Sequence, residues 1–402
     1  MTCARRCRAL KICILSSFED LLLKDTGSSV RIYQLAKGLA SLNNDVHVVL
    51  PGLKFADKRI DKMTIHSARG ALPKGFFRAI CRLVGISRPT SLYFYDLSFI
   101  VRIAPVILQS DVVQIEQQTA GGLLIPMISW IWKKPLVLDC HDVFQALKVR
   151  HVSRVRRILE TFLERIAYRY ATLILTVSET EKASLTSYGV GITPIDIVPN
   201  GVDTNVFAKA IVKTDVKDRY GLRDSSTIIF VGNMEYLPNM EALKLIETRI
   251  APVVRGLSKT KFLIVGRSPS KKVSNGIIFT GVVDNVAEYL AASDVAIAPL
   301  LHGSGTRLKI LEYFSSGLAV VSTSVGVEGL DVKNGIHAIV EDDIDAFALR
   351  IMELLNDKEL SMRLGGAAKS LVNEKYDWKT IAGHLNASIQ EMIRSERKEA
   401  RA

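Results

Sequence analysis

The fold is most constrained by an alternation of short β-rich runs with amphipathic helical stretches, which occurs twice along the chain. The first series of runs is KICILSS, DVHVVL, DVVQI, PLVLD and TLILTVS, and the second is TIIFVG, KFLIVG, GIIFTG, DVAIAPL and LAVVST. Strands that alternate with helices form parallel sheets joined by right-handed crossovers. The sequence therefore predicts an α/β protein with two doubly wound, Rossmann-like domains.

The two series meet at IDIVPNGVDTNVF, in which Pro199, Asn200 and Gly201 form a turn-forming cluster. A chain of 402 residues, 48% of them hydrophobic, exceeds the length at which a single core stops growing, so its size agrees with two domains. We predict a first domain over 1–205, a second over 206–377, and a C-terminal helix with a charged tail over 378–402. In such sheets ligands bind outside the carboxyl ends of the strands, so functional residues should follow strand ends and face a cleft between the domains.

The apolar segments and the cysteines indicate the compartment. No stretch reaches the roughly 18 to 20 uninterrupted apolar residues that a membrane-spanning helix needs. The N-terminal sequence MTCARRCRALKICILSS has a basic flank, but its apolar run is too short for a signal peptide. The five cysteines form no Cys-x-x-Cys pair, which is typical of a reducing environment. We therefore expect a cytoplasmic protein.

The net charge of +12 predicts anionic partners, which include phosphate-bearing ligands, acidic lipids and nucleic acid. Basic residues concentrate between Lys148 and Arg169. This segment is either a solvated helix face or a surface that meets anionic lipid, which would place the protein peripherally at the inner face of the membrane. No nucleic-acid-binding module is recognisable, so nucleic acid is not an expected partner.

The most informative segment is DVAIAPLLHGSGTRLKILEYFSSGLAVVST, which predicts a strand, a loop, a helix and a strand. Backbone amides can approach an anion at the start of this helix because the loop consists of small residues: Gly303, Ser304, Gly305 and Thr306. Arg307 and Lys309 add cations, and Glu312 lies on the same helix face as Lys309. A diphosphate near Lys309 and a ribose near Glu312 would fit one bound nucleotide. In the structural alternative, Thr306 caps the helix and Lys309 pairs with Glu312 at the surface.

Several segments, in their order and spacing, resemble the family 4 retaining glycosyltransferases of the GT-B fold: LTVSETE, VPNGVD with Phe207, IIFVGNMEYLPN, FTGVVDN and TRLKILEYFSSGLAVVST. The resemblance covers nearly the whole chain. It implies a GT-B architecture and transfer of a sugar from a nucleoside diphosphate sugar to an acceptor hydroxyl with retention of configuration. No cofactor and no metal are implied. Synthesis of a glycan, a glycolipid or a cell-surface polysaccharide would fit, with a lipid-linked or a small-molecule acceptor.

The resemblance also assigns donor-side residues in the second domain. Glu312 matches the second glutamate of the family's Glu-x7-Glu motif, which holds the nucleotide ribose, whereas Ser304 occupies the position of the first glutamate. Many relatives carry an arginine and a lysine in the loop after the first strand of this domain. Here that loop starts with Gly232 and Asn233 and contains no cation. Val283, in FTGVVDN, is a further donor-side position.

Two cations can replace those of the missing pair. Arg307 and Lys309 are the best available groups to stabilise the negative charge on the departing diphosphate, so we predict that both are catalytic. The sequence Asp343-Ile344-Asp345 is similar to a metal-binding Asp-x-Asp, but it directly precedes a helical run, where aspartates cap helices. We therefore expect no metal site.

In the first domain, Thr26-Gly27-Ser28-Ser29 follows the first predicted strand and resembles the family's glycine-rich loop, which faces the donor phosphates. Gly27 and Ser28 are therefore candidate donor-binding residues, and a helix cap at this position is compatible with that role. The start of the next helix supplies Arg31 as an acceptor-side candidate. A second acceptor-side candidate is Glu116, which follows DVVQI.

His141 and Asp142 follow the strand predicted over 135–139, where a strand-end loop would project toward the ligand. We predict catalytic roles for both: His141 would contact the donor sugar or orient the acceptor hydroxyl. The alternative is that His141 is a structural residue with satisfied hydrogen bonds, which is the commoner state of a single histidine.

Three other functions were compared with a transferase. A nucleotide-sugar-binding but inactive partner subunit would explain Ser304 in place of the glutamate. A GT-B-fold nucleotide-sugar epimerase or an inverting transferase would need carboxylates placed for proton abstraction or attack. A dinucleotide-dependent oxidoreductase is disfavoured because no Gly-x-Gly-x-x-Gly follows the first strand.

Overall fold

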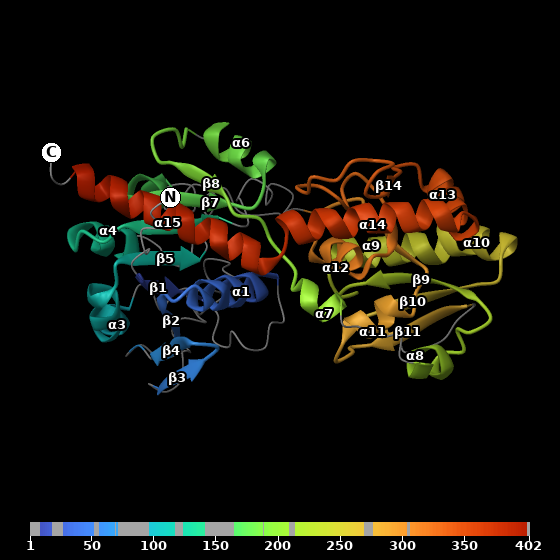
Figure 1. Ribbon diagram of the computed structural model, residues 1–402, viewed down its shortest axis with the longest axis horizontal. Helices are drawn as coiled ribbons and strands as arrows, with labels where there is room; N and C mark the ends of the chain where they lie inside the picture. Colours follow the sequence, from blue (N-terminus) through green and yellow to red (C-terminus); the bar gives the residue numbers. More distant parts are fainter. Residues whose placement is uncertain are drawn as a thin grey trace, which may run out of the picture. The chain divides into compact units, whose positions relative to one another are not determined.

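The computed structural model describes residues 9–17, 27–51, 56–68, 70, 96–116, 124–140, 165–187, 189–208, 214–268, 276–303 and 306–399. The chain divides into two compact units, each with its own sheet and helices (Figure 1). Unit 1 comprises residues 1–199 and 381–402, and unit 2 comprises residues 200–380. The predicted α/β class with two mostly parallel sheets is confirmed.

The sheet of unit 1 has eight strands in the order β3-β4-β2-β1-β5-β6-β7-β8. Only β3 and β4 are antiparallel to each other among these described strands. The strands are β1 (Lys11–Leu15), β2 (Asp45–Pro51), β3 (Ala56–Ile60), β4 (Met63–Ala68), β5 (Val112–Glu116), β6 (Leu136–Cys140), β7 (Leu173–Thr176) and β8 (Ile195–Ile197). β1 pairs with β2 on one side and with β5 on the other, so the direction of winding reverses at β1. The ligand-binding switch point of a doubly wound sheet therefore lies at the carboxyl ends of β1 and β5.

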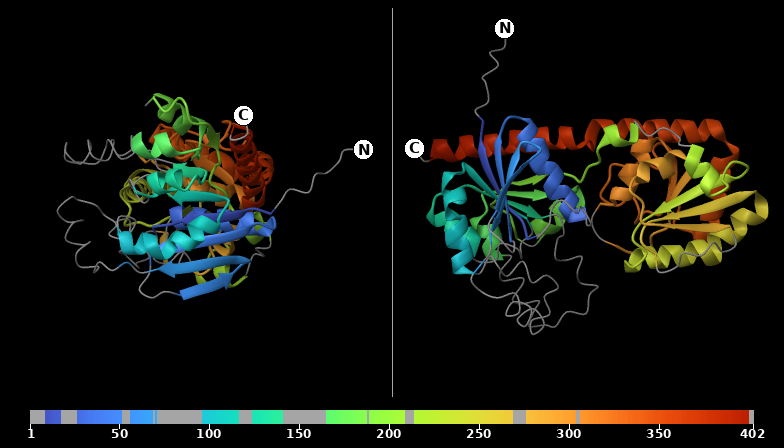
Figure 2. Two further views of the ribbon diagram at one scale, coloured as in Figure 1. Left: turned by 90° about the vertical axis from the view of Figure 1, so that its left-hand side faces the viewer. Right: turned by 90° about the horizontal axis from the view of Figure 1, so that it is seen from below.

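Helices cover both faces of this sheet, which explains why strands such as β6 are buried along their whole length. The helix α1 (Gly27–Ser41) lies on one face, and α3 (Leu97–Gln109) and α4 (Leu124–Ile131) lie on the other (Figure 2). Asp96 caps α3 by accepting a hydrogen bond from Ser98 N. The helix α6 (Glu179–Ser187) joins β7 to β8.

The sheet of unit 2 has six strands in the order β11-β10-β9-β12-β13-β14, and all of its registered pairs are parallel. The strands are β9 (Ser226–Val231), β10 (Thr260–Val265), β11 (Ile277–Gly281), β12 (Val295–Ala298), β13 (Ala319–Ser322) and β14 (Ile339–Val340). The first strand, β9, lies in the middle of the sheet beside β12. The switch point of unit 2 therefore lies at the carboxyl ends of β9 and β12.

Two hydrophobic cores cover the two faces of this second sheet. Ile229 and Val231 of β9 point into one core, and Ile228 and Phe230 point into the other, as the alternation of a strand requires. The helices are α7 (Thr204–Ala208), α8 (Thr214–Arg219), α9 (Leu237–Leu245), the π-helical turn η3 (Ile246–Ile250), α10 (Ala251–Leu257), α11 (Val286–Ala291), α12 (Leu308–Ser316), α13 (Ile344–Asn356) and α14 (Lys358–Lys375). Asp343 caps α13 by accepting a hydrogen bond from Asp345 N.

The boundaries of the units differ from the predicted domains. The division falls between Pro199 and Asn200 rather than near residue 205. The last helix, α15 (Trp378–Glu399), is not a separate segment, because residues from 381 onward pack with unit 1. For example, Asn44 Nδ2 donates a hydrogen bond of 2.9 Å to Asn386 Oδ1. Among the described helices, none has the length and apolar character needed to cross a bilayer.

Candidate active site

The candidate site in unit 2 lies at the switch point. Gly232 and Asn233 directly follow β9, and Thr306 and Arg307 directly precede α12, in the connection that leaves β12. The predicted loop residues Ser304 and Gly305 lie outside the described residues. The structure thus brings both donor-side segments predicted from sequence to the same edge of one sheet.

Lys309 extends from the first turn of α12 toward the end of β9. Its Nζ donates a hydrogen bond of 2.7 Å to Asn239 Oδ1 and lies 4.2 Å from the centroid of the Phe230 ring. A methyl group at Gly232 would place its carbon 3.0 Å from the same Nζ. The ammonium is therefore held by an amide oxygen and an aromatic face, and within the described part of the chain it makes no ion pair.

Asn239 connects this lysine to the loop after β9. The side chain is 7% exposed, and its Nδ2 donates a hydrogen bond of 2.9 Å to the carbonyl of Asn233. Behind this loop, the backbone of Gly232 packs tightly on Gly266, where a Cβ would lie 2.0 Å from the carbonyl oxygen of Gly232. Gly266 also has φ of +124°. Glycines at both positions let the loop turn closely enough to reach Lys309.

Glu312 lies one turn further along α12 and keeps part of its surface exposed. Its carboxylate accepts no hydrogen bond in the part of the chain that the structure describes. Burial raises the pKa of Glu312 to about 7, although the charge of Lys309 opposes this change. Conversely, burial and the nearby Arg307 charge lower the pKa of Lys309 to about 7, with Glu312 opposing. Both groups therefore change protonation near neutral pH, and a charged ligand would shift their pKa values.

The N-terminus of α12 is not capped as the structural alternative assumed. Arg307 occupies the cap position without a side-chain cap bond, whereas Thr306 Oγ1 accepts a hydrogen bond of 2.7 Å from Asn200 Nδ2. The guanidinium of Arg307 lies against Gly303, where a Cβ would be 2.6 Å from Nη2 and where φ is +142°. Arg307 therefore provides no side-chain cap for the first amides of α12, and the cations of Arg307 and Lys309 lie beside them.

A tyrosine fixes the position of α12 against β9. Tyr313 is fully buried, and its hydroxyl accepts a hydrogen bond of 2.8 Å from the backbone N–H of Val231. Tyr313, Ile310 and Phe314 belong to the buried face of the helix, and Lys309 and Glu312 lie at its margin. The hydrogen bond of Tyr313 therefore holds the helix that carries Lys309 and Glu312 in a fixed position against β9.

The predicted residues of unit 1 are only partly described. Gly27 opens α1 and is exposed, and Ser28 is partly buried. Glu116 is the last residue of β5, at the switch point, but the position of its side chain lies outside what is described. His141 and Asp142 also lie outside the described residues and directly follow the end of β6.

The structure also describes the surroundings of Arg31 and Val283. Arg31 is 1% exposed and makes a two-pronged ion pair with Asp139, with Nε–Oδ2 and Nη2–Oδ1 distances of 2.9 Å. It is therefore enclosed in the protein and does not face an acceptor, which corrects the acceptor-side assignment. Val283 is partly buried and packs against the core of unit 2, so its donor-side role stays a prediction.

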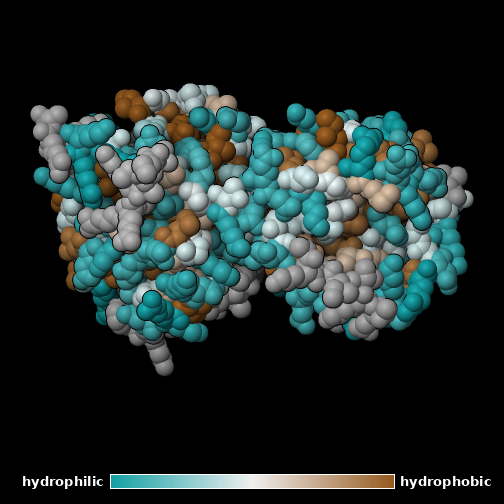
Figure 3. Space-filling view, in the orientation of Figure 1, coloured by the Kyte–Doolittle hydropathy of each residue, from teal (hydrophilic) through white to brown (hydrophobic). Residues whose placement is uncertain are grey.

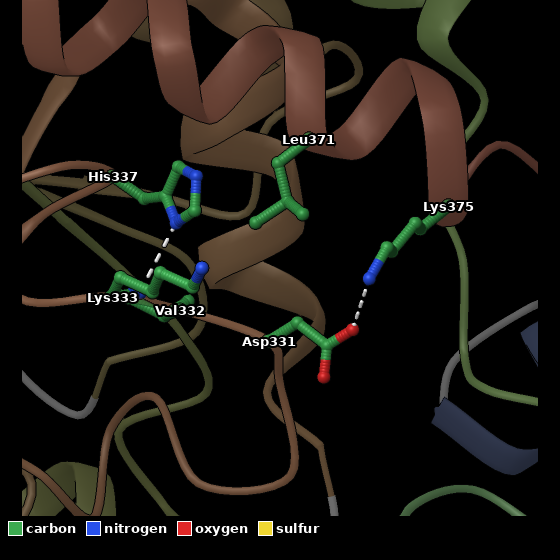
Figure 4. A pocket seen from close by; sticks show the side chains of 6 residues that line it. All are labelled: Asp331, Val332, Lys333, His337, Leu371 and Lys375. Atoms are coloured by element: carbon green, nitrogen blue, oxygen red, sulfur yellow. Dashed lines mark hydrogen bonds and ion pairs between the residues drawn. The ribbon is translucent and has the colours of Figure 1, made fainter.

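A separate cavity of about 390 Å³ lies beside α14 and contains none of the predicted residues (Figure 4). It is lined by Asp331, Val332, Lys333, His337, Leu371 and Lys375. Lys375 Nζ is 2.6 Å from Asp331 Oδ2, and His337 Nδ1 accepts a hydrogen bond of 3.1 Å from the backbone N–H of Lys333. Burial lowers the pKa of His337, and Lys333 adds to this effect. The cavity is lined by charged and apolar side chains and is distinct from the group of residues around Lys309.

Comparison with known proteins gives the family. Residues 26–206 match the family described as "Glycosyltransferase Family 4", and residues 225–357 match the family described as "Glycosyl transferases group 1". The chain belongs to the family 4 glycosyltransferases. The family predicted from the sequence is thus confirmed, and the two matches together cover most of the chain, one largely in each unit.

Individual curated relatives share less than 30% identity with this chain. The chain is 28% identical over 250 residues to the UDP-Gal:alpha-D-GlcNAc-diphosphoundecaprenol alpha-1,3-galactosyltransferase of Escherichia coli, covering 57% of the chain and 62% of the relative. It is 25% identical over 221 residues to the N-acetyl-alpha-D-glucosaminyl L-malate synthase of Bacillus anthracis, covering 50% of the chain and 55% of the relative. The chain therefore spans less than two thirds of the length of these curated relatives.

Solved structures show the same fold over nearly the whole chain. Sucrose-phosphate synthase from Thermosynechococcus elongatus matches with a TM-score of 0.71 at 16% identity, covering 96% of this chain and 99% of that one. Anabaena HepE, in complex with UDP and glucose, matches with a TM-score of 0.69 at 15% identity, covering 94% and 99%. At these identities the likeness concerns the fold alone, and it confirms the GT-B architecture.

The sequence does not predict four residues that shape the candidate site: Asn200, Phe230, Asn239 and Tyr313. Asn200 lies within VPNGVD and had been interpreted only as part of a turn. Phe230 and Tyr313 have the ordinary pattern of core residues, and no signal marks their contacts with Lys309 and with β9. Asn239 follows the loop after β9, where only cations were sought, so its bond to Lys309 could be found only from coordinates.

Proposed function

We propose that this protein transfers a sugar from a nucleoside diphosphate sugar to an acceptor hydroxyl with retention of anomeric configuration. The observation that carries the proposal is the arrangement on α12. Lys309 is held at the end of β9, and Glu312, which accepts no hydrogen bond from the described residues, follows it three residues later in the same helix. A cation at a helix N-terminus and a carboxylate within one nucleotide length of it suit a diphosphate and a ribose.

In the proposed donor complex, Lys309 and Arg307 bind the diphosphate, and Glu312 accepts hydrogen bonds from the ribose hydroxyls. Gly232 lets the backbone of the β9 loop approach the phosphates. A bound diphosphate favours the charged ammonium of Lys309, whose pKa of about 7 would otherwise leave it half neutral at neutral pH. Diphosphate binding thus favours the protonated, positively charged form of Lys309, which stabilises the negative charge of the leaving group.

The reaction that we propose breaks the bond between the anomeric carbon and the diphosphate oxygen and forms a bond from the acceptor oxygen on the same face. The electron pair of the broken bond goes to the diphosphate, where Arg307 and Lys309 stabilise it. The proton of the acceptor hydroxyl goes to an oxygen of the departing diphosphate. His141, Asp142 and Glu116 remain the candidates for contacts with the donor sugar and the acceptor.

We further propose that the acceptor is lipid-linked and that the enzyme contributes to glycan or glycolipid synthesis at an anionic membrane. Two relatives support this class of acceptor: the Escherichia coli enzyme named above acts on a diphosphoundecaprenol substrate, and a Mycobacterium tuberculosis relative, 23% identical over 212 residues, is a phosphatidylinositol monomannoside mannosyltransferase. The second covers 48% of this chain and 54% of the relative.

The surface of unit 1 supports contact with such a membrane. Large apolar side chains are exposed on the outer faces of α3 and α4, where hydrophobic residues gather in Figure 3: Leu97, Val101, Leu108, Trp130 and Ile131. Exposed cations lie on the same elements or next to them: Arg102, Lys133 and Arg169. The ring of Trp130 on α4 lies 5.8 Å from that of Tyr170, the residue after Arg169. Apolar and aromatic side chains mixed with cations are the composition of surfaces that lie on anionic bilayers.

Release of nucleoside diphosphate from UDP-, GDP- and ADP-sugars, with and without a lipid extract, tests the proposal. Donor-specific release that rises with the extract is the expected result, and the anomeric coupling of the product by NMR should equal that of the donor. Lys309→Met should abolish release, whereas Lys358→Met, an exposed lysine on α14, should not change it. Tight nucleotide binding without release from any donor would favour the inactive-subunit alternative, and an inverted product would contradict retention.

The membrane surface has its own test, which does not depend on turnover. Leu97→Ser combined with Ile131→Ser should reduce co-sedimentation with vesicles that contain anionic lipid. Ile192→Ser, which changes a fully exposed apolar residue elsewhere on unit 1, is the matched control. Binding of the wild type should also weaken with salt, because the attraction is screened within about 10 Å at 0.1 M ionic strength. Equal binding by all three proteins would exclude this surface.

A further inference from the structure

One ion pair is enclosed at the carboxyl end of the first sheet. Arg31 is 1% exposed and Asp139 is 0% exposed, and the arginine is the largest fully buried side chain of the described residues. Taking two charges out of water is expensive, and replacing such pairs by apolar residues is often neutral or stabilising. Stability alone therefore does not explain why this position carries a pair of charges.

The arginine uses three of its nitrogens on two separate segments. Nε and Nη2 each donate a hydrogen bond of 2.9 Å to the Asp139 carboxylate, and Nη1 donates one of 3.0 Å to the carbonyl of Pro199. Asp139 lies on β6, and Pro199 is the last residue of unit 1 before the chain continues into unit 2. One side chain of α1 thus connects a strand end with the connection between the units. A lysine could not reproduce this planar, forked geometry.

The three connected segments each lead into residues of the proposed site. The helix α1 begins with the donor-side candidates Gly27 and Ser28, one turn before Arg31. The strand β6 ends one residue after Asp139 and leads directly to the candidates His141 and Asp142. After Pro199 comes Asn200, whose side chain donates to Thr306 at the start of α12.

We infer that Arg31 and Asp139 are positioning residues for sugar transfer, which fix these three segments relative to one another. The inference rests on the proposed function, but it assigns the pair no contact with either substrate. The directional hydrogen bonds of Arg31 fix the positions of the β6 end and of Pro199 relative to α1. An apolar pair would make no such bonds, so these segments could shift. Displacements of about 1 Å in groups that orient a reaction can lower its rate by about a hundredfold.

The test compares three variants with the wild type. Arg31→Lys keeps the charge and loses the fork, and Arg31→Met combined with Asp139→Leu removes both charges and fills the space. For both we expect kcat for diphosphate release to fall at least tenfold, while the donor KM changes less than threefold and the double variant keeps its Tm. Arg223→Lys, which alters an exposed forked pair with Asp218 on unit 2, should leave kcat unchanged.

Hydrogen exchange separates a failure of this inference from a failure of the proposed function. In Arg31→Lys, amides in the segments 136–140 and 196–203 should exchange at least several times faster than in the wild type, whether or not the protein transfers sugar. If a stable double variant shows wild-type kcat, or if exchange in both segments is unchanged in Arg31→Lys, the pair is only structural and the inference is overturned. If the wild type releases no diphosphate, the proposed function fails, and the exchange result still decides the positioning of the segments.

Discussion

Replacing the proposed ribose-binding carboxylate should make the ligand-free protein more stable. Glu312 lies on the margin of the buried face of α12 and accepts no hydrogen bond from the described residues, so its negative charge is only partly solvated. Lys309 opposes this penalty but does not cancel it, because the net effect of burial is still to raise the pKa of the carboxyl. Glu312→Gln keeps the shape of the side chain and removes the charge. We therefore expect a gain in stability together with a loss of nucleotide affinity.

The pKa of Glu312 gives the size and the pH dependence of the gain. Burial raises it from 4.5 to about 7, and at about 1.4 kcal/mol for each pH unit this difference corresponds to about 3 kcal/mol. The side chain keeps some exposure, so solvent screening reduces our expectation to about 1–2 kcal/mol. Because the pKa is higher in the folded state, the neutral carboxyl contributes its full stability below pH 4.5, and this contribution is lost as the pH rises through about 7. The variant and the wild type should therefore be equally stable near pH 4 and differ most at pH 8.

The assay is thermal unfolding of both proteins between pH 4 and 9 without nucleotide. For a unit of this size, about 1–2 kcal/mol corresponds to an increase in Tm of about 2 to 8 °C at pH 8. Glu247→Gln, which changes an exposed glutamate of the same unit, is the matched control and should show no such pH-dependent difference. If Glu312→Gln is less stable than the wild type at pH 8, or if its gain is independent of pH, the charge is compensated in the folded protein and the argument from burial is refuted.

Three further results are expected for the same site. Lys309→Met should weaken UDP binding, measured by calorimetry, by roughly 10- to 100-fold, which corresponds to the loss of one charge-assisted hydrogen bond. The affinity of the wild type for UDP should fall as the pH rises above about 7, because the pKa of Lys309 is lowered to about 7 and the ammonium then loses its proton. Gly232→Ala should weaken UDP binding with only a small change in Tm, because its Cβ would meet side-chain atoms at 2.7 and 3.0 Å. Gly266→Ala should yield insoluble protein, because its Cβ would lie 2.0 Å from a backbone oxygen. Tyr313→Phe should lower the free energy of unfolding in urea by about 1–3 kcal/mol, because a buried N–H of β9 loses its acceptor.

The architecture could be predicted because parallel sheets covered on both faces leave a simple record in the sequence. Each buried strand is a short apolar run, and each run is followed by a helical stretch, so the number and order of the central strands can be determined before any coordinates are known. The antiparallel strand β3, ADKRI, has no such run, and it was not predicted. The boundary between the units was placed a few residues too late, because a turn-forming cluster shows where the chain bends but not which unit each residue packs against.

The site could be predicted where its chemistry depends on spacing within one helix. Lys309 and Glu312 share a helix face because they are three residues apart, and this requires no tertiary information. The partners of Lys309 come from β9 and α9, and the partner of Thr306 comes from the connection between the units, so these contacts depend on the packing of segments that are distant in sequence. The same limit applies to Arg31, since no local pattern distinguishes an arginine that faces a ligand from one that is enclosed by its own protein.

Burial has different consequences for Arg31 in unit 1 and for Lys309 and Glu312 in unit 2. The charge of Arg31 is fully enclosed and is met by a carboxylate and a carbonyl, so its hydrogen bonds hold segments of unit 1 in place. Lys309 has an amide oxygen and an aromatic ring, and Glu312 has no hydrogen-bond partner among the described residues, so burial leaves both with perturbed pKa values and unmet bonding capacity. Perturbed, incompletely satisfied charges destabilise a fold unless a ligand completes them. The stability gained in Glu312→Gln and the rate lost in Arg31→Lys would therefore distinguish a binding site from the scaffold that positions it.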